Sequence, residues 1–227
     1  DEYHGELNFY QDGGIIINAN GMKGIGIGSG LGGVINIKRG HYEFDMKGQE
    51  GACIGSVNGD SELFIEYCDM DIYSGISNGT IIGSVNGDAD IKLENISAKL
   101  QGAGNIITGI GTIAGNSCMV RLENVNISSN IRAKECYGIG CRAGRTNIYI
   151  GYAAVKSVVQ GKSAVAFGNS VMSAKLYCSN ADVGTNAVTE FNSDIGALEK
   201  NIQLENGRAE FILNGQEVKR QILAARL

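Results

Sequence analysis

The sequence lacks proline and tryptophan entirely over its 227 residues. The missing proline excludes a collagen triple helix, which needs proline and a strict triplet period. Charged residues are also scarce, at 19%, whereas hydrophobic residues reach 43%, and this balance indicates a packed core rather than disorder. No apolar run reaches the roughly 20 residues of a membrane-spanning helix. We therefore expect a folded chain of one large domain or two small ones, without membrane insertion.

Positive charge and histidine are also in short supply. There are 19 basic and 24 acidic residues, which gives a net charge of −5, and only two histidines. Nucleic acid is not an expected partner, because phosphate binding needs a basic patch. The chain opens at Asp1 without a methionine or a signal peptide. We expect it to be a mature or trimmed piece of a longer protein, with room for flanking domains.

Glycine is the residue in excess, with 34 present, about twice the usual share of about 7%. The pentapeptide Ser-Val-Asn-Gly-Asp occurs at 56–60 and again at 84–88, each time after Ile-Gly. An apolar residue precedes that glycine in every copy of the pattern, and a small residue follows it. Such regular self-similarity is typical of a solenoid. Six anchor glycines lie 27 to 29 residues apart: Gly28, Gly55, Gly83, Gly111, Gly140 and Gly168.

Each repeat also carries apolar residues at alternating positions, the pattern of a β-strand. Leu63 and Ile65, like Ile91 and Leu93, follow their anchors by eight and ten residues. Up to three such segments fit in one repeat, and no repeat contains a convincing helical stretch. These features predict an all-β, right-handed parallel β-helix of six to seven coils. Glycine would supply positive φ at the corners, and proline would be excluded because interior strands pair on both sides.

Both ends of the array need a cap, because an open coil exposes backbone and core. Residues 1–23 are interpreted as a partial first coil, residues 24–191 as the β-helix repeats and residues 192–227 as a C-terminal cap. Within that cap, Asn206-Gly207 predicts a β-hairpin. Residues 216–227 contain helix formers, with Val218, Ile222 and Leu223 on one side, and predict a short helix.

The segment Gly-Ile-Gly-Ile-Gly-Ser-Gly-Leu-Gly-Gly-Val-Ile-Asn-Ile-Lys at 24–38 resembles the glycine-rich repeats of right-handed, pectin-lyase-like β-helix proteins of bacterial surfaces. The resemblance extends roughly over residues 24–191 and is strongest in the first three coils. It implies a secreted or cell-surface protein whose role concerns glycans. Adhesins, carbohydrate-binding modules and polysaccharide lyases all use such a scaffold, so the resemblance does not choose among them.

The six cysteines show no pairing pattern. No two occupy the same position in adjacent repeats, and none forms a Cys-x-x-Cys pair, so neither a stacked disulfide nor a zinc site is expected. Cys178 falls on the inward position that Ile65 and Leu93 share. We expect mostly free, buried thiols, which leaves a cytoplasmic location open beside a secreted or cell-surface one.

Outward positions hold the candidate binding residues. Aromatic and basic side chains recur about nine residues after the anchors, and glutamates recur two residues further on. Rings beside hydrogen-bonding groups suit carbohydrate, because pyranose faces stack on rings while hydroxyls bond to polar groups. The alternative is a solvated sheet face on which lysine and glutamate alternate. The candidates are Phe64, Lys92, Arg121, Tyr149 and Tyr177 in the first row and Glu66, Glu94 and Glu123 in the second.

Four carboxylates are expected at one corner of two adjacent coils, with Asp60 over Asp88 and Glu62 over Asp90. Stacked like charges repel unless a cation or solvent intervenes, and calcium takes oxygen ligands from such clusters. The alternative is an exposed turn, because Asn-Gly-Asp is ordinary turn sequence. Calcium is the only cofactor that the sequence suggests.

Three hypotheses about function follow. The first is a non-catalytic, adhesin-like module of a secreted or cell-surface bacterial protein, which binds a polysaccharide or a surface protein on an outer sheet face. The second is a polysaccharide lyase or glycoside hydrolase on the same scaffold. The even spacing of the repeats leaves no inserted loop to build a cleft, and no catalytic residue can be placed, which favours the first. The third is a structural or sensory spacer of a larger protein, which free thiols would suit.

Overall fold

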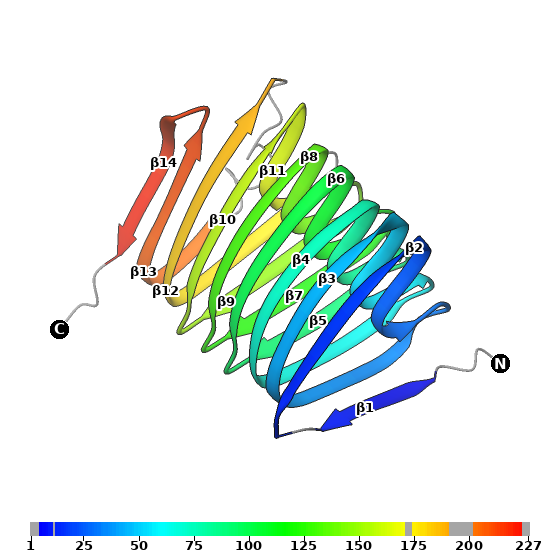
Figure 1. Cartoon of the computed structure of the whole chain (residues 1–227). Coiled ribbons are helices and arrows are strands. Elements are labelled where there is room, and N and C mark those ends of the chain that lie inside the picture. Colours follow the sequence, from blue (N-terminus) through cyan, green and yellow to red (C-terminus); the bar gives the residue numbers. More distant parts are fainter. Residues whose placement is uncertain (1–4, 11, 171–173, 191–201, 224–227) are drawn as a thin grey trace.

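The computed structural model describes residues 5–10, 12–170, 174–190 and 202–223. In these ranges every regular element is a strand, and there is no helix that is long and apolar enough to cross a membrane. The strands form one parallel β-solenoid of about seven turns, with about 28 residues per turn (Figure 1). The fold class predicted from the glycine repeat is confirmed.

The strands are β1 (Glu6–Tyr10), β2 (Gly14–Ser29), β3 (Gly33–Asn58), β4 (Ser61–Asn86), β5 (Ala89–Glu94), β6 (Ser97–Thr112), β7 (Ser117–Glu123), β8 (Asn126–Cys141), β9 (Arg145–Gly151), β10 (Ala154–Gly161), β11 (Ser163–Gly168), β12 (Ala174–Thr189), β13 (Ile202–Leu213) and β14 (Gln216–Leu223).

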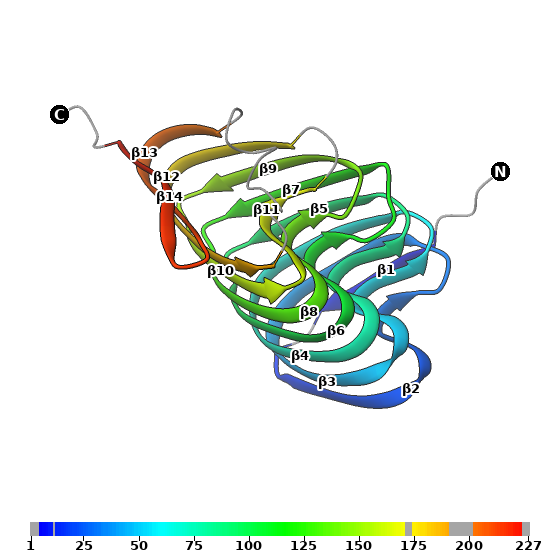
Figure 2. The same ribbon diagram turned by 90° about the horizontal axis from the view of Figure 1, so that it is seen from above.

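Each coil contributes to three walls. The first wall pairs β1 with the starts of β3 and β4, and then β5, β7, β9 and the starts of β12 and β13. The second wall runs from the start of β2 through β3, β4, β6, β8, β10 and β12 to the end of β13. The third wall holds the segments that carry the anchor glycines. Figure 2 shows β5, β7 and β9 side by side on the first wall.

The anchor glycines stack in register along the third wall. Gly55 pairs with Gly28 on one side and with Gly83 on the other, and the row continues to Gly168. All six anchors have positive φ, between 97° and 152°. A Cβ atom on Gly83 would lie 1.8 Å from the carbonyl oxygen of Gly111, so no side chain fits there. The sequence correctly predicts positive φ at the anchors, but they lie within or at the end of their strands rather than at the corners between strands.

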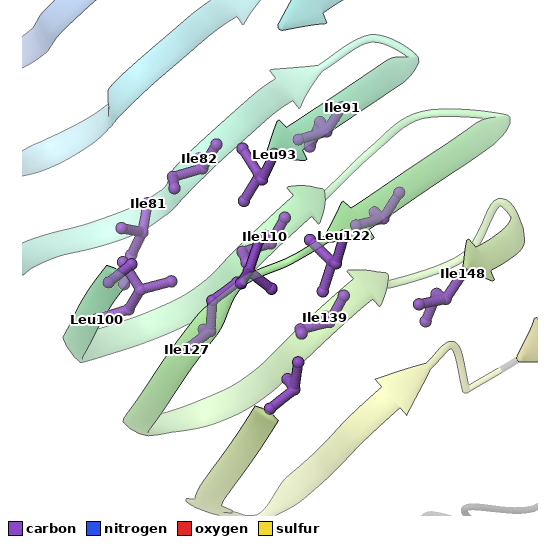
Figure 3. Packing of buried hydrophobic residues seen from close by; sticks show 14 of the residues in the cluster. Ile81, Ile82, Ile91, Leu93, Leu100, Ile110, Leu122, Ile127, Ile139 and Ile148 are labelled. Carbon is purple, nitrogen blue, oxygen red and sulfur yellow. The ribbon is translucent and has the colours of Figure 1, made fainter. Parts of the chain in front are cut away.

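Inward side chains of the first wall form aliphatic ladders along the solenoid. Figure 3 shows inward side chains directed into the space between the walls, among them Ile91, Leu122 and Ile110. Burial of each aliphatic side chain contributes about 1.5–3 kcal/mol, so these ladders supply most of the drive for folding. One ladder, with no member more than 2% exposed, consists of Ile35, Leu63, Ile91, Val120, Ile148 and Leu176.

A buried polar row follows the anchor glycines, at the small position of each repeat. The hydroxyls of Ser56 and Ser84 both donate to the carbonyl oxygen of Gly59 at 2.9 Å. Thr112 donates to the carbonyl oxygen of Gly87 at 2.7 Å. These bonds satisfy the buried hydroxyls and the corner carbonyls together, which explains why a small polar side chain recurs after the anchor.

The corner between the first and second walls places one residue per coil in the left-handed region. Asparagine suits this conformation because its short polar side chain tolerates it. The side-chain amide of Asn124 donates to Asn95 Oδ1 at 2.5 Å, so neighbouring corners are also bonded to each other. The seven corner residues, with φ between 46° and 63°, are Arg39, Tyr67, Asn95, Asn124, Tyr152, Asn180 and Asn206.

The C-terminal part differs from the prediction in two ways. Asn206-Gly207 is not a hairpin turn, because β13 passes through it in parallel with β12. The hairpin lies further on, where Asn214-Gly215 connects β13 to antiparallel β14. The predicted helix is wrong for residues 216–223, which form β14: pairing with the open edge of β13 outweighs helix propensity. The remaining cap residues, 192–201 and 224–227, lie outside the described ranges.

Candidate functional site

The outer face of the first wall carries both predicted rows of candidate binding residues. Lys92 pairs with Phe64 on one side and with Arg121 on the other, and Tyr149 follows Arg121 and precedes Tyr177. Glu66, Glu94 and Glu123 form the neighbouring row. The alignment of repeats therefore places these side chains correctly, and their binding role stays a prediction.

In the coils that carry β3, β4, β5 and β7, each basic residue of this face pairs with a carboxylate, whereas Glu62 and Glu123 have no ion pair with a described residue. The hydrogen bond from Lys92 to Glu94 raises the pKa of the lysine. Exposed pairs of this kind contribute at most about 1 kcal/mol each, and they occupy the charged groups. This part of the face has the features of a solvated sheet surface. The pairs are Lys38–Glu66 at 3.4 Å, Lys92–Glu94 at 2.7 Å and Arg121–Asp90 at 2.6 Å.

Tyr149 and Tyr177 form a stacked pair in the next two coils. Their ring centroids lie 4.8 Å apart, and their planes differ by 5°. Because atoms in contact lie about 3.5–4 Å apart, this centroid distance requires the rings to be offset by about 3 Å. The offset leaves part of a ring face uncovered, and Tyr149 is 40% exposed. The pair thus presents a rigid aromatic surface to solvent.

Two hollows border the tyrosine pair. The first, called the β7 hollow, measures about 520 Å³ and is lined by Lys92, Glu94, Met119, Arg121, Leu122, Glu123 and Tyr149. The second, called the β13 hollow, measures about 430 Å³. Its lining includes Glu123, Tyr149, Gly151, Tyr177, Gln203 and Glu205. Both volumes lie in the range of about 300–1,000 Å³ that is usual for small-ligand sites.

The floor of the β13 hollow exists because the row of glutamates is interrupted. After Glu123 the row continues with Gly151 and Ser179 and returns to an acid at Glu205. The Glu123 side chain leans over the glycine: a Cβ atom on Gly151 would lie 2.2 Å from Glu123 Oε2. Glu123 therefore covers Gly151, and the small side chain of Ser179 leaves room beside the tyrosine rings.

Gln203 and Glu205 were missed by the sequence analysis, which assigned them to a hairpin. Pairing with β12 brings Gln203 opposite Tyr177 and Glu205 opposite Ser179. A signal for this was present, because Leu-Glu-Asn occurs at 93–95, 122–124 and 204–206. In each copy the asparagine occupies the left-handed corner between the first and second walls.

The four carboxylates predicted to bind calcium have other partners in three cases. Asp60 Oδ1 accepts the backbone N–H of Asp88 at 2.8 Å, and Asp90 pairs with Arg121. Asp88 Oδ1 accepts two backbone N–H groups of the next coil. Glu62 lies opposite Asp90 in the register. No group of three or more histidine, cysteine, aspartate and glutamate side chains within the described ranges is arranged to hold a metal ion. Calcium binding stays a prediction.

A larger hollow, of about 620 Å³, lies on the second wall over β8, β10, β12 and β13. Its charged lining residues are Lys156, Asp182, Arg208 and Glu210, and Arg208 lies 2.6 Å from Glu210. No aromatic residue of the described chain lines it. Mixed, paired charge without a ring surface makes it a weaker candidate than the hollows beside the tyrosines.

All six cysteines are free and buried, as predicted. Burial raises the pKa of Cys53, Cys68 and Cys178 to about 12. Because the thiolate is the reactive form, these groups are chemically inert core residues.

No protein-family model matches this chain, and no curated protein or solved structure matches it either. The parallel β-solenoid stands on the structure itself, and the outer face of the first wall is characterised by its own geometry: a stretch with ion pairs followed by a stacked tyrosine pair between two hollows.

Proposed function

We propose that this chain is a non-catalytic, adhesin-like β-solenoid module of a secreted or cell-surface bacterial protein, and that it binds carbohydrate on the outer face of the first wall. The observation that carries the proposal is the offset stack of Tyr149 and Tyr177 between the β7 and β13 hollows. Exposed rings beside hydrogen-bonding side chains are what sugar faces and hydroxyls require.

The scaffold supports binding more than catalysis. From β2 to β12 the coils follow one another at 27 to 29 residues, so no inserted loop raises walls around either hollow within the described chain. A rigid, open face suits a polymer that lies across several coils. The buried thiols are compatible with an oxidising compartment, because inert core cysteines do not need to be paired there.

A glycan array followed by calorimetry tests the proposal. We expect Tyr149→Ala and Tyr177→Ala each to weaken binding of the selected glycan at least about fivefold, because loss of an aromatic contact costs about 1 kcal/mol or more. Tyr73→Ala is the matched control, since Tyr73 is 38% exposed on the second wall and should not affect binding. Equal loss in all three variants, or no glycan binding at all, would refute the proposal.

The polysaccharide lyase or glycoside hydrolase on the same scaffold is tested with the same preparations. Release of reducing ends or unsaturated products from the bound polymer, lost in the tyrosine variants, would replace the binding module by an enzyme.

A further inference from the structure

The described lining of the β13 hollow is acidic. Glu123 and Glu205 are the charged residues in its lining, and both side chains are exposed. Within the described ranges, neither carboxylate has an ion pair or a side-chain hydrogen bond. The glutamates of the coils below are different, since Glu66 and Glu94 each lie within 3.4 Å of a lysine. The described lining of the hollow therefore holds two acids and no basic residue.

Nearby cations do not compensate this charge. Arg121, in the row of the tyrosines, is bonded to Asp90 and lines the β7 hollow instead. Lys175 lies two residues before Tyr177 on β12 and is not part of the lining of the β13 hollow. A ligand with a carboxylate, such as a uronic acid, would meet like charge here without a basic partner.

A protonated amine is complementary to the carboxylates and the aromatic rings of this lining. Carboxylates accept short, charge-assisted hydrogen bonds from an ammonium group. The uncovered faces of Tyr149 and Tyr177 attract a cation through the ring quadrupole. The Gln203 amide can donate to and accept from hydroxyl groups, and the small side chain of Ser179 leaves room on the floor. Three coil spacings of about 4.8 Å place the Cα atoms of Glu123 and Glu205 about 14 Å apart, so more than one residue of a sugar chain fits between them.

We infer that the β13 hollow binds a polysaccharide segment that carries free amino groups, such as a glucosamine polymer, through Glu123, Glu205 and the tyrosine pair. The inference rests on the proposed carbohydrate-binding function and names its ligand class. A lysine-rich peptide offers the same ammonium group, and the ring faces and Gln203 favour the sugar because they match hydroxylated rings.

Calorimetry with matched oligomers of glucosamine, N-acetylglucosamine and glucose tests the inference. N-acetylation removes the charge and keeps the ring, so we expect the glucosamine oligomer to bind about tenfold more tightly than the other two. This magnitude follows because a partly exposed ion pair strengthens binding up to about fivefold, and two carboxylates are present. Equal affinities for the three oligomers would overturn the inference and leave the proposed function standing. Absence of binding to every glycan would overturn both.

Variants assign the preference to the hollow. Glu123→Gln and Glu205→Gln should each weaken binding of the glucosamine oligomer about threefold to fivefold without changing the affinity for N-acetylglucosamine oligomer, since only the charged contact is removed. Glu43→Gln on the second wall, an exposed carboxylate at the side of His41, is the control and should change neither. Equal weakening for both oligomers would overturn the inference, and so would tighter binding of tri-lysine than of the glucosamine oligomer.

Discussion

Replacement of Gly83 by alanine should destabilise the solenoid more than any exposed substitution. Gly83 has φ of +137°, a conformation that L side chains rarely adopt, and such a residue costs about 1–3 kcal/mol. The new Cβ atom would also lie 1.8 Å from the carbonyl oxygen of Gly111, 2.8 Å from its carbonyl carbon and 3.2 Å from its nitrogen. All three atoms belong to the backbone, so no side-chain rotation relieves the overlap.

The magnitude follows from how far the two coils must separate. Relief of the contact needs a shift of more than about 1 Å across strands that are spaced about 4.8 Å apart, which breaks the local inter-coil hydrogen bonds. Each lost backbone bond costs about 1 kcal/mol, so strain and two lost bonds together lower the free energy of unfolding by about 3–5 kcal/mol. Domains of this kind are stable by about 5–15 kcal/mol, so the variant should still fold but unfold at much lower urea concentration.

Urea unfolding followed by far-UV circular dichroism and tyrosine fluorescence measures the effect. The matched control is Gly184→Ala, because a Cβ atom on Gly184 meets no atom within 4 Å and its φ is not in the positive region. We expect the control to be neutral or stabilised by up to about 1 kcal/mol, since alanine loses less backbone entropy on folding. A Gly83→Ala variant that unfolds within about 0.5 kcal/mol of the wild type would refute the stacking argument.

Three further predictions concern the thiols and the corners. The free energy of unfolding should fall as the pH rises above about 9, by up to about 1.4 kcal/mol per pH unit for each thiol. The pKa of Cys53, Cys68 and Cys178 in the folded chain is about 12, so above pH 9 these thiols ionise only in the unfolded chain. Their stabilisation is fully present below the pKa of the unfolded thiol and is lost as the pH rises. The urea midpoint measured at pH 8 and pH 10 checks this, and Cys178→Val should reduce the difference. Asp88→Ala should lower the free energy of unfolding by about 1–2 kcal/mol, because Asp88 Oδ1 accepts the backbone N–H groups of Asn116 at 2.6 Å and Ser117 at 3.0 Å. Asp69→Ala is the control, because Asp69 is exposed. Tyr67→Asn should raise the free energy of unfolding by up to about 1 kcal/mol, since φ is +56° and asparagine accepts that conformation; Tyr73→Asn should give no gain.

The fold was predictable because the same residues perform the same backbone task in every coil. A glycine on the third wall repeats at 27 to 29 residues, and the inward ladder from Ile35 to Leu176 stays aliphatic, so register follows from alignment alone. The coil between β6 and β8 has 29 residues instead of 28, and this difference has a local cause. One extra residue lies between Thr112 and Cys118 relative to the coil before it, and Asp88 caps the enlarged corner.

The last coil and the β13 hollow were not predicted, because local signals were stronger there than the repeat. Asn-Gly at 206–207 is the usual hairpin sequence, yet the repeat uses it as a corner in which Asn206 has φ of 52° and Gly207 has φ of 125°. The helix propensity of residues 216–223 wrongly predicted a helix. These residues form β14 instead, because they pair with the unpaired backbone groups at the edge of β13. Without β13 in the sheet, Gln203 and Glu205 could not be placed beside the tyrosines.

Folding restricts the inward residues of the first wall much more than its outward residues. The outward residues of the coils that carry Tyr149 and Tyr177 therefore need an explanation other than folding. Inward positions must fill a closed core, and the ladder from Ile35 to Leu176 is aliphatic in every coil. Outward positions contribute little to stability, and a lysine–glutamate pair satisfies them at low cost. Exposed rings and unpaired acids are not needed to fold the wall, and at Gly151 the wall even loses a side chain. The coils that depart from the pairing pattern are therefore where a ligand, rather than folding, best explains the choice of residues.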